Sequence, residues 1–294
     1  MTAKKCAFLT MADPGESAID FDVSFAAMAD FGWGVETIVW RDCAADWEVY
    51  DAVYICTPWD YPQHQDEFVR VLQSIEDSSA VLVNPLSLVH WTLAKSYLRD
   101  LEQRGADIVP SYWFDEFDEE QMSGWFDALR SDKVVIKPAV GANALDTHVL
   151  VNPIAPEVLS HLIDTFQERP FLVQPFIENI LGEGEYSLFY FGGVYSHAVQ
   201  KVPQAGDFRV QEEYGGEVSS VQPSMQLLEA GEYVLSLVEP QPVYARADFV
   251  RGPDDKFLLM ELELIEPSLY LRTDVAAASR FAAAFDQYVA EVRE

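Results

Sequence analysis

Short apolar runs alternate with helix-type patterns through the first third of the chain. Runs rich in β-branched and aromatic residues predict strands, and segments whose apolar residues recur every three or four positions predict helices. In chain order we expect strand 5–10, helix 22–31, strands 34–41 and 50–56, helix 67–75 and strand 80–84. Strands that alternate with helices are typical of a parallel sheet, so this part of the chain is predicted to be an α/β domain.

The pattern becomes less regular after residue 92 and gains hairpin character. Gly192 and Gly193 separate two aromatic runs, which predicts a tight turn between antiparallel strands. The expected elements are helix 93–103, a strand near 109, helix 119–130, strands 133–138 and 147–151, helix 156–167, strands 171–177, 186–191 and 194–202, and a closing helix 276–292. The C-terminal half is therefore predicted to be α+β.

One strand near the end of the chain carries the most informative polar pattern. It is expected to place Met260, Leu262 and Leu264 on one face, because successive side chains alternate. Glu261 and Glu263 then share the opposite face. Two carboxylates on one face repel each other unless the face is hydrated or a hard divalent cation lies between them.

Asp248 extends this acidic face to a second strand. It lies on the polar side of the strand pattern 244–250, so we expect Asp248, Glu261 and Glu263 to present oxygen donors from two adjacent strands. Mg²⁺ is usually held by few carboxylates together with substrate phosphates. This pattern therefore predicts a metal site and draws attention to nucleotide-binding residues elsewhere.

A lysine at the end of a β-branched strand is the first candidate for phosphate binding. Lys137 lies at the end of strand 133–138, and the small residues Gly141, Ala142 and Asn143 follow. Small side chains let backbone N–H groups approach phosphate oxygens, and the lysine supplies a point charge. A surface lysine before a turn is the alternative interpretation of this segment.

Two later segments strengthen the nucleotide interpretation. The backbone of the apolar strand 171–177 could pair with an adenine edge, and the Glu185 carboxylate could accept from ribose hydroxyls. Lys201 and Arg209 then place two cations in a chain that has few.

The net charge of the chain limits its partners. The formal net charge is −30, which argues against nucleic acid and anionic membranes, since both favour a basic surface. A highly solvated acidic surface is the simplest interpretation, and an anionic ligand would need a locally basic pocket. Whether the chain forms a homo-oligomer stays open.

Cysteine usage and the start of the chain indicate a cytoplasmic protein. Cys6, Cys43 and Cys56 show no metal-type spacing, and their odd number is typical of reduced thiols. Asp13 and Glu16 interrupt the apolar start, so no signal peptide is expected. No apolar run reaches the length of a membrane span.

Several common catalytic motifs are missing. The chain contains no G-x-x-x-x-G-K-[ST] phosphate loop, no complete dinucleotide fingerprint, no G-x-S-x-G elbow and no H-E-x-x-H motif. Its five histidines are scattered, which favours surface or packing positions over metal ligands. Nucleophilic-triad and zinc chemistry are therefore not predicted.

An ordered set of weak motifs resembles the ATP-grasp superfamily. The resemblance covers roughly residues 95–268. Within the superfamily, the motifs are similar to those of prokaryotic glutathione synthetase. The chain resembles in particular the branch that contains the D-cycloserine synthetases (O-ureido-serine cyclo-ligases). The motifs are Lys95, Val135-Ile136-Lys137-Pro138, Gln174-Pro175-Phe176-Ile177, Glu185, Lys201, Asp207-Phe208-Arg209, Asp248 and Glu261-Leu262-Glu263.

The resemblance implies a role for each of these residues. It assigns the α- and β-phosphates to Lys95 and Lys137, and closure over the phosphates to the loop of Gly141, Ala142 and Asn143 through Ala144. It assigns the γ-phosphate and the reacting carboxyl group to Arg209. Lys201 stands where the family often has arginine, and Glu263 where it commonly has asparagine. The remaining implied sites are adenine at Gln174, Pro175, Phe176 and Ile177, ribose at Glu185, and the metal at Asp248, Glu261 and Glu263.

The implied activity is that of an ATP-dependent carboxylate–amine ligase that works through an acyl phosphate. Its cofactors would be ATP and Mg²⁺, with Mn²⁺ as an alternative metal. Its substrates would be a small amino-acid-like carboxylate and an amine, and ring closure within one molecule stays open. A non-catalytic ATP-binding or regulatory module on the same fold is the competing hypothesis, because a fold does not determine its function.

The resemblance also implies a domain organisation. We expect a pre-ATP-grasp α/β domain over 1–92 and an ATP-grasp region over 93–294, with a small lid at about 108–175. Trp59, Asp60 and Tyr61 follow a strand of the first domain, where ligands of open α/β sheets bind. Packing and capping are the alternative roles for these three residues. Arg272 is a candidate for a substrate carboxylate or an ordinary surface arginine.

Overall fold

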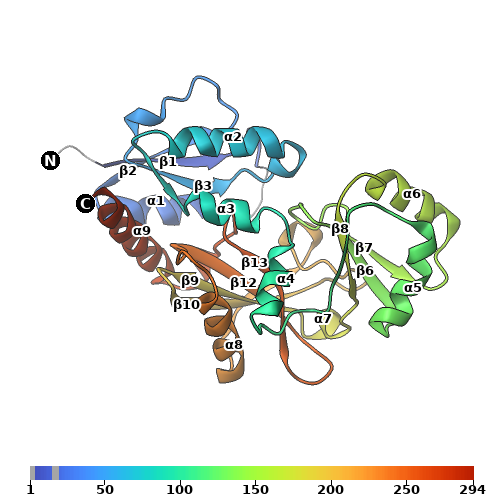
Figure 1. Ribbon diagram of the computed structural model, residues 1–294. Coiled ribbons are helices and arrows are strands. Elements are labelled where there is room, and N and C mark those ends of the chain that lie inside the picture. Colours follow the sequence, from blue (N-terminus) through green and yellow to red (C-terminus); the bar gives the residue numbers. More distant parts are fainter. Residues whose placement is uncertain (1–3, 15–19) are drawn as a thin grey trace.

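The computed structural model describes residues 4–14 and 20–294 and contains three sheets (Figure 1). The N-terminal sheet is parallel, as predicted. Its strands, in spatial order, are β2 (Trp33–Val39), β1 (Lys4–Thr10), β3 (Ala52–Thr57) and β4 (Val81–Val83). Helix α2 (Gln65–Glu76) covers one face, and α1 (Phe21–Asp30) and α9 (Ala277–Arg293) cover the other.

Alternation along β1 explains why this sheet is covered on both faces. Ala7 and Leu9 pack in the core under α2, whereas Cys6 and Phe8 pack in the core that contains α9. A strand with apolar residues on both faces must be buried on both, which is typical of parallel sheets.

The central sheet is antiparallel. Its strands, in spatial order, are β11 (Glu217–Ser220), β10 (Val194–Val202), β9 (Glu185–Phe191), β12 (Tyr244–Arg251) and β13 (Phe257–Glu263). The predicted hairpin joins β9 to β10 through Gly192 and Gly193, which adopt φ of 56° and 75°. Phe281 of α9 lies 5.5 Å from Phe191 and 5.2 Å from Tyr54, measured between ring centroids. Helix α9 therefore joins the central sheet to the N-terminal sheet.

The small sheet is also antiparallel and carries its own helices. Its strands are β5 (Tyr112–Phe114), β8 (Phe171–Pro175), β6 (Lys133–Pro138) and β7 (His148–Val151), and its helices are α5 (Glu119–Leu129) and α6 (Pro156–Phe166). Val134 and Ile136 of β6 pack with these helices in one apolar core. Val135 and Lys137 alternate to the other face and line a pocket.

The segment that carries Lys95 differs from its prediction. Instead of one helix over 93–103, the chain forms α3 (Leu86–Thr92) and α4 (Tyr97–Gln103), with Lys95 between them. The backbone N–H of Lys95 donates to the carbonyl of Ala139 at 2.7 Å, a contact from outside either helix. A long-range contact of this kind overrides local helix propensity and has no signal in a single segment.

The strand predicted near Val109 is also wrong in extent. Ile108 forms a single bridge with Leu259, and the next strand begins at Tyr112. Pro110 has no backbone N–H, which explains why the pairing does not continue.

A β-bulge changes the predicted faces of β13. Asp248 pairs with Glu261 but Phe249 pairs with Leu259, so Met260 is the extra residue. Met260 therefore lies on the pocket side with Glu261, and its predicted place beside Leu262 is wrong.

Among the described residues, α3, α7 (Asn179–Gly182), β11 and α8 (Met225–Ser236) have no predicted counterpart. Helix α8 packs with α4 on the face of the central sheet opposite the pocket. The other predicted elements are present, with ends that differ by one or two residues. Within the described ranges, no helix is long and apolar enough to cross a bilayer.

Candidate active site

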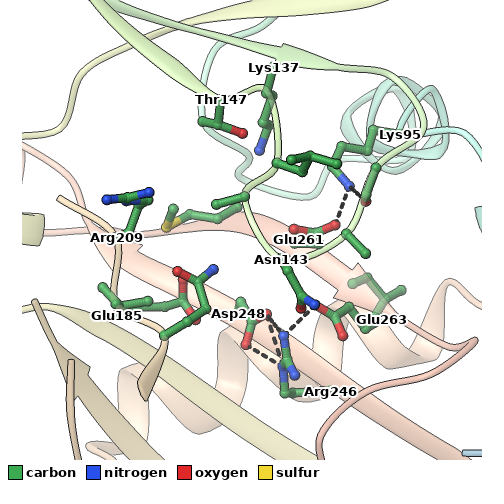
Figure 2. Close-up of a pocket in the computed structure, with 18 of the residues that line it drawn as sticks. Lys95, Lys137, Asn143, Thr147, Glu185, Arg209, Arg246, Asp248, Glu261 and Glu263 are labelled. Atoms are coloured by element: carbon green, nitrogen blue, oxygen red, sulfur yellow. Dashed lines mark hydrogen bonds and ion pairs between the residues drawn. The ribbon is translucent and has the colours of Figure 1, made fainter. Parts of the chain in front are cut away.

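The pocket lies between the central sheet and the small sheet (Figure 2). Its walls come from β6 and β8 on one side and from β10, β12 and β13 on the other. The structure brings to this one pocket all the residues to which the resemblance gave a role: Lys95, Lys137, Gly141, Ala142, Asn143, Gln174, Pro175, Phe176, Ile177, Glu185, Lys201, Arg209, Asp248, Glu261 and Glu263.

Two lysines reach the pocket from different elements. The Lys95 ammonium donates to the Gly141 carbonyl at 3.1 Å and forms an ion pair with Glu261. Lys137 is buried, yet its ammonium forms no hydrogen bond or ion pair with any residue that the structure describes. Burial lowers the pKa of Lys137 to about 8; Glu261 opposes the shift and the charge on Lys95 adds to it. A buried cation without a partner of its own is suited to an anionic ligand.

Alternation along the central strands gathers charges on the pocket face. Lys201 of β10 donates to the Glu185 carboxylate of β9 at 2.8 Å and lies 3.7 Å from Asp248 of β12. Register places Asp248 opposite Glu261, as expected for acids on two adjacent strands. Ala245, Ala247 and Phe249 of β12 alternate to the opposite face and pack in the apolar core.

Arg246 is a functional candidate that carried no predicted role. Its guanidinium holds Asp248 through Nε–Oδ1 and Nη2–Oδ2 contacts, both 3.0 Å, and also pairs with Glu263 across the ladder. Only 9% of Arg246 is exposed. The signal was present in the sequence, because a spacing of two puts Arg246 on the same strand face as Asp248.

The pKa values of the acids follow from these pairs. Burial would raise the pKa of Glu261, but Lys95 and Lys137 outweigh it and hold the pKa below its ordinary value. Arg246 and Lys201 likewise overcome burial and lower the pKa of Asp248. Burial raises the pKa of Glu263 to about 7 despite Arg246.

These acids fit a site that shares Mg²⁺ with phosphate. In the described parts of the chain, no three His, Cys, Asp or Glu side chains converge closely enough to hold a metal by themselves. Mg²⁺ does not require such a cage, because it binds through one or two carboxylates, substrate phosphates and water. Asp248 and Glu261, which are register neighbours on the pocket face, are donors of the right chemistry.

One part of the pocket wall is apolar. Phe176, Ile177, Val210, Val250 and the bulged Met260 belong to one cluster there. The Gln174 side chain donates to Ser111 at 2.8 Å, which fixes its orientation beside this cluster. An apolar slot next to buried lysines can accept a flat base attached to phosphates.

The loop after β6, which carries Asn143, meets the loop after β10, which carries Arg209 and Tyr214, over the pocket. The Tyr214 hydroxyl donates to the Asn143 carbonyl at 3.3 Å, and Arg209 lies 3.7 Å over the Tyr214 ring. Arg209 also forms a two-point ion pair with Asp207, with Nη2–Oδ2 at 2.7 Å. Arg209 is thus the predicted cation that is held by its own loop rather than by the acids of the sheet.

Four further candidates have mixed outcomes. Trp59 and Tyr61 line the pocket, in agreement with the substrate-pocket alternative. Asp60 instead accepts a 2.6 Å hydrogen bond from the Trp40 indole, which is a packing role. Arg272 pairs with Asp20 and Glu212 and is absent from the pocket walls.

Comparisons with known proteins agree with this geometry. Residues 6–84 match the family model of the N-terminal domain of D-cycloserine synthetase DcsG. The cycloserine biosynthesis protein DcsG of Streptomyces lavendulae is 30% identical over 284 residues, which cover 90% of this chain and 93% of that protein. The crystal structure of D-cycloserine synthetase DcsG has a TM-score of 0.84 and 27% identity over 97% of this chain and 99% of that one.

A more distant likeness shows the fold alone. The ATP-grasp ligase PsnB, solved with a precursor variant, Mg and ADP, has a TM-score of 0.68 and 13% identity over 98% of this chain and 99% of that one. The three sheets and the cation-lined pocket define the class of ATP-grasp ligases. The chain belongs to the D-cycloserine synthetase family within this superfamily. It is accordingly an ATP-dependent ligase that forms C–N bonds, and the predicted fold and family are confirmed.

Proposed function

We propose that this protein activates the carboxylate of a small amino-acid-like substrate as an acyl phosphate and joins it to a nitrogen nucleophile. The observation that carries the proposal is the unpaired, buried Lys137 ammonium on the pocket wall, next to Lys95 and facing an acidic strand pair. A polyphosphate is the ligand whose charge and size complement such a wall, because it brings the anion that Lys137 lacks.

We assign the nucleotide along the length of the pocket. The apolar cluster around Phe176 and Met260 takes adenine, with backbone groups of Pro175 and Ile177 on its edge. Glu185 accepts from ribose, and Lys95 and Lys137 bind the α- and β-phosphates. The loop of Gly141, Ala142 and Asn143 closes over them, together with the lid at about 108–175. The division into a pre-ATP-grasp domain over 1–92 and an ATP-grasp region over 93–294 belongs to the same proposal.

Asp248, Glu261 and Glu263 would hold Mg²⁺, or Mn²⁺ in its place. When bound, the metal supplies charge neutralisation for the β- and γ-phosphates. In this structure Glu261 is paired with Lys95 and Glu263 with Arg246, so a metal held by these carboxylates would compete with both cations for them. Lys95 would then bind the phosphates, and Arg246, which also holds Asp248, would interact with the reacting carboxyl group.

The chemistry proceeds in two displacements. An oxygen of the substrate carboxylate attacks the γ-phosphorus, the bond to the β-bridging oxygen breaks, and ADP leaves. A nitrogen then attacks the acyl carbon, inorganic phosphate leaves, and the nitrogen loses a proton. Both steps need positioning and charge stabilisation rather than a side-chain nucleophile. Arg246 and Arg209 are the cations we assign to the developing charge, and Lys201 holds Glu185 and Asp248 in place.

Family membership directs the choice of substrate. We propose that the nitrogen belongs to the same molecule as the carboxylate, so that the product is a ring of the cycloserine type. Incubation of the purified protein with Mg-ATP and a panel that includes O-ureido-serine and ordinary amino acids should release phosphate only with a true substrate. ATP binding without substrate-stimulated phosphate release across this panel would instead support the non-catalytic module.

A further inference from the structure

Glu266 is a pocket acid to which the nucleotide and metal assignments give no role. It follows β13 at the point where the chain meets the loop after β3, and it lines the pocket together with Trp59 and Tyr61. The Trp59 indole donates to the Glu266 carbonyl at 3.1 Å, and the Tyr61 hydroxyl is near enough to the Glu266 carboxyl group to influence its pKa. These contacts fix Glu266 between the N-terminal and central sheets.

Glu266 has no cationic side chain as an ion-pair partner in the described ranges. Four other acids of the pocket each form an ion pair, namely Glu185, Asp248, Glu261 and Glu263. Glu266 forms none with the residues of the described ranges, and its nearest influential cation, Lys95, is already paired with Glu261. Burial, with a contribution from Glu263, raises the pKa of Glu266 to about 8. A ligand that brings a positive charge would relieve this poorly solvated acid.

The aromatic neighbours favour the same kind of ligand. Tyr61 is 4% exposed and stacks on Phe68 at 4.7 Å between centroids, so its ring and hydroxyl are held rigidly. Trp59 is half-buried on the same wall. An ammonium group is attracted both to a carboxylate and to the faces of aromatic rings, and a pocket that combines them selects cations over neutral groups.

We propose that Glu266, Trp59 and Tyr61 form an ammonium subsite that binds the α-ammonium group of the acid substrate. The inference rests on the proposed function and deepens it, because it makes Glu266 a specificity-determining residue for amino acids over hydroxy acids. The α-ammonium group is then held as a recognition element and is not the nitrogen that attacks the acyl phosphate.

The test compares wild type with Glu266→Gln, which keeps the shape and removes the charge. Phosphate release is measured with Mg-ATP and the amino acid of the panel that is turned over best, beside the hydroxy acid of the same skeleton. We expect the KM for the amino acid to rise about 10- to 100-fold, the range for loss of one charged hydrogen bond, while the KM for ATP stays unchanged. Preference for the amino acid over the hydroxy acid should shrink, and Glu266→Asp should restore part of it.

Other outcomes overturn the subsite. An unchanged KM for the amino acid contradicts the subsite. A rise in the KM for ATP alone would also contradict it, because it would mean that Glu266 affects nucleotide binding through Lys95. Glu229→Gln, the same change on the exposed surface of α8, is the control and should match wild type.

A binding measurement separates this inference from the proposed function. Serine, glycerate and D-cycloserine are titrated calorimetrically into the Mg-ADP complex of each variant. If no acid releases phosphate, the proposed function fails, but serine or D-cycloserine binding that Glu266→Gln abolishes still supports the subsite. Equal binding of glycerate and serine, or no binding of any ammonium compound to wild type, contradicts it.

Discussion

The backbone N–H of Lys95 donates a 2.7 Å hydrogen bond to the carbonyl of Ala139, two residues after Lys137. One backbone contact thus links the turn before α4 to the end of β6. The Lys95 ammonium also donates to the Gly141 carbonyl in the loop after β6. The spacing of the two lysines therefore depends both on the turn between α3 and α4 and on the small sheet. Movement of the small sheet must therefore change the position of both cations together.

Lys137→Met should separate nucleotide binding from folding. The change removes a buried, unpaired cation, so we expect the folded protein to keep or gain stability. The loss of a preorganised charge contact to phosphate should lower kcat/KM for ATP by about 10²- to 10³-fold. Phosphate-release kinetics and thermal unfolding with and without Mg-ATP measure both effects. Lys256→Met, on an exposed lysine of a surface turn, is the control; equal kinetics of the two variants would remove Lys137 from the site.

Nucleotide affinity should depend on pH through Lys137. Its pKa is lowered from 10.5 to about 8 in the free protein, so the ammonium is present below this pH and is lost as the pH rises through it. Phosphate stabilises the charged form and raises the pKa, so ATP binding near pH 8 should take up a proton and weaken at higher pH. Calorimetry in buffers of different ionisation enthalpy measures the uptake, which Lys137→Met should abolish. Proton release in wild type would contradict this assignment.

The sequence predicts the site better than it predicts the local fold around it. Strand alternation predicts that Asp248 and Glu261 share one face, because periodicity determines which face a side chain occupies, whereas the packing of the small sheet brings Lys137 to the same pocket. Alternation could not reveal the bulge at Met260, since a bulge depends on the partner strand. The break before α4 likewise depends on Ala139, far away in the chain.

Arg246→Met should damage both stability and turnover. Removing the guanidinium leaves Asp248 and Glu263 buried without their main partner, which typically costs about 3–5 kcal/mol. We expect a loss of this order in urea-induced unfolding, and phosphate release close to background. Arg246→Lys keeps the charge but not the two-point contact, so it should recover part of the stability and less of the activity. Wild-type unfolding of Arg246→Met would show that the network is not coupled as described.

Gly184→Ala should destabilise the strand that carries Lys201. Gly184 has φ of +85°, and an added Cβ would lie 2.1 Å from the Lys201 carbonyl oxygen. Left-handed strain and this clash together should cost at least about 2 kcal/mol and displace Lys201 from Glu185. Gly182→Ala is the matched control, because its Cβ would meet nothing within 4 Å. Unfolding curves that do not separate the two variants would contradict the close approach at Gly184.

The acyl phosphate is tested most directly by following an oxygen atom. An acid of the panel that stimulates phosphate release is labelled with ¹⁸O in its carboxyl group, and the released phosphate is examined by ³¹P NMR. If the carboxylate attacks the γ-phosphorus, one labelled oxygen must pass from the acid to inorganic phosphate in each turnover. Phosphate that carries one ¹⁸O is the predicted result, and product formed with unlabelled phosphate would contradict it.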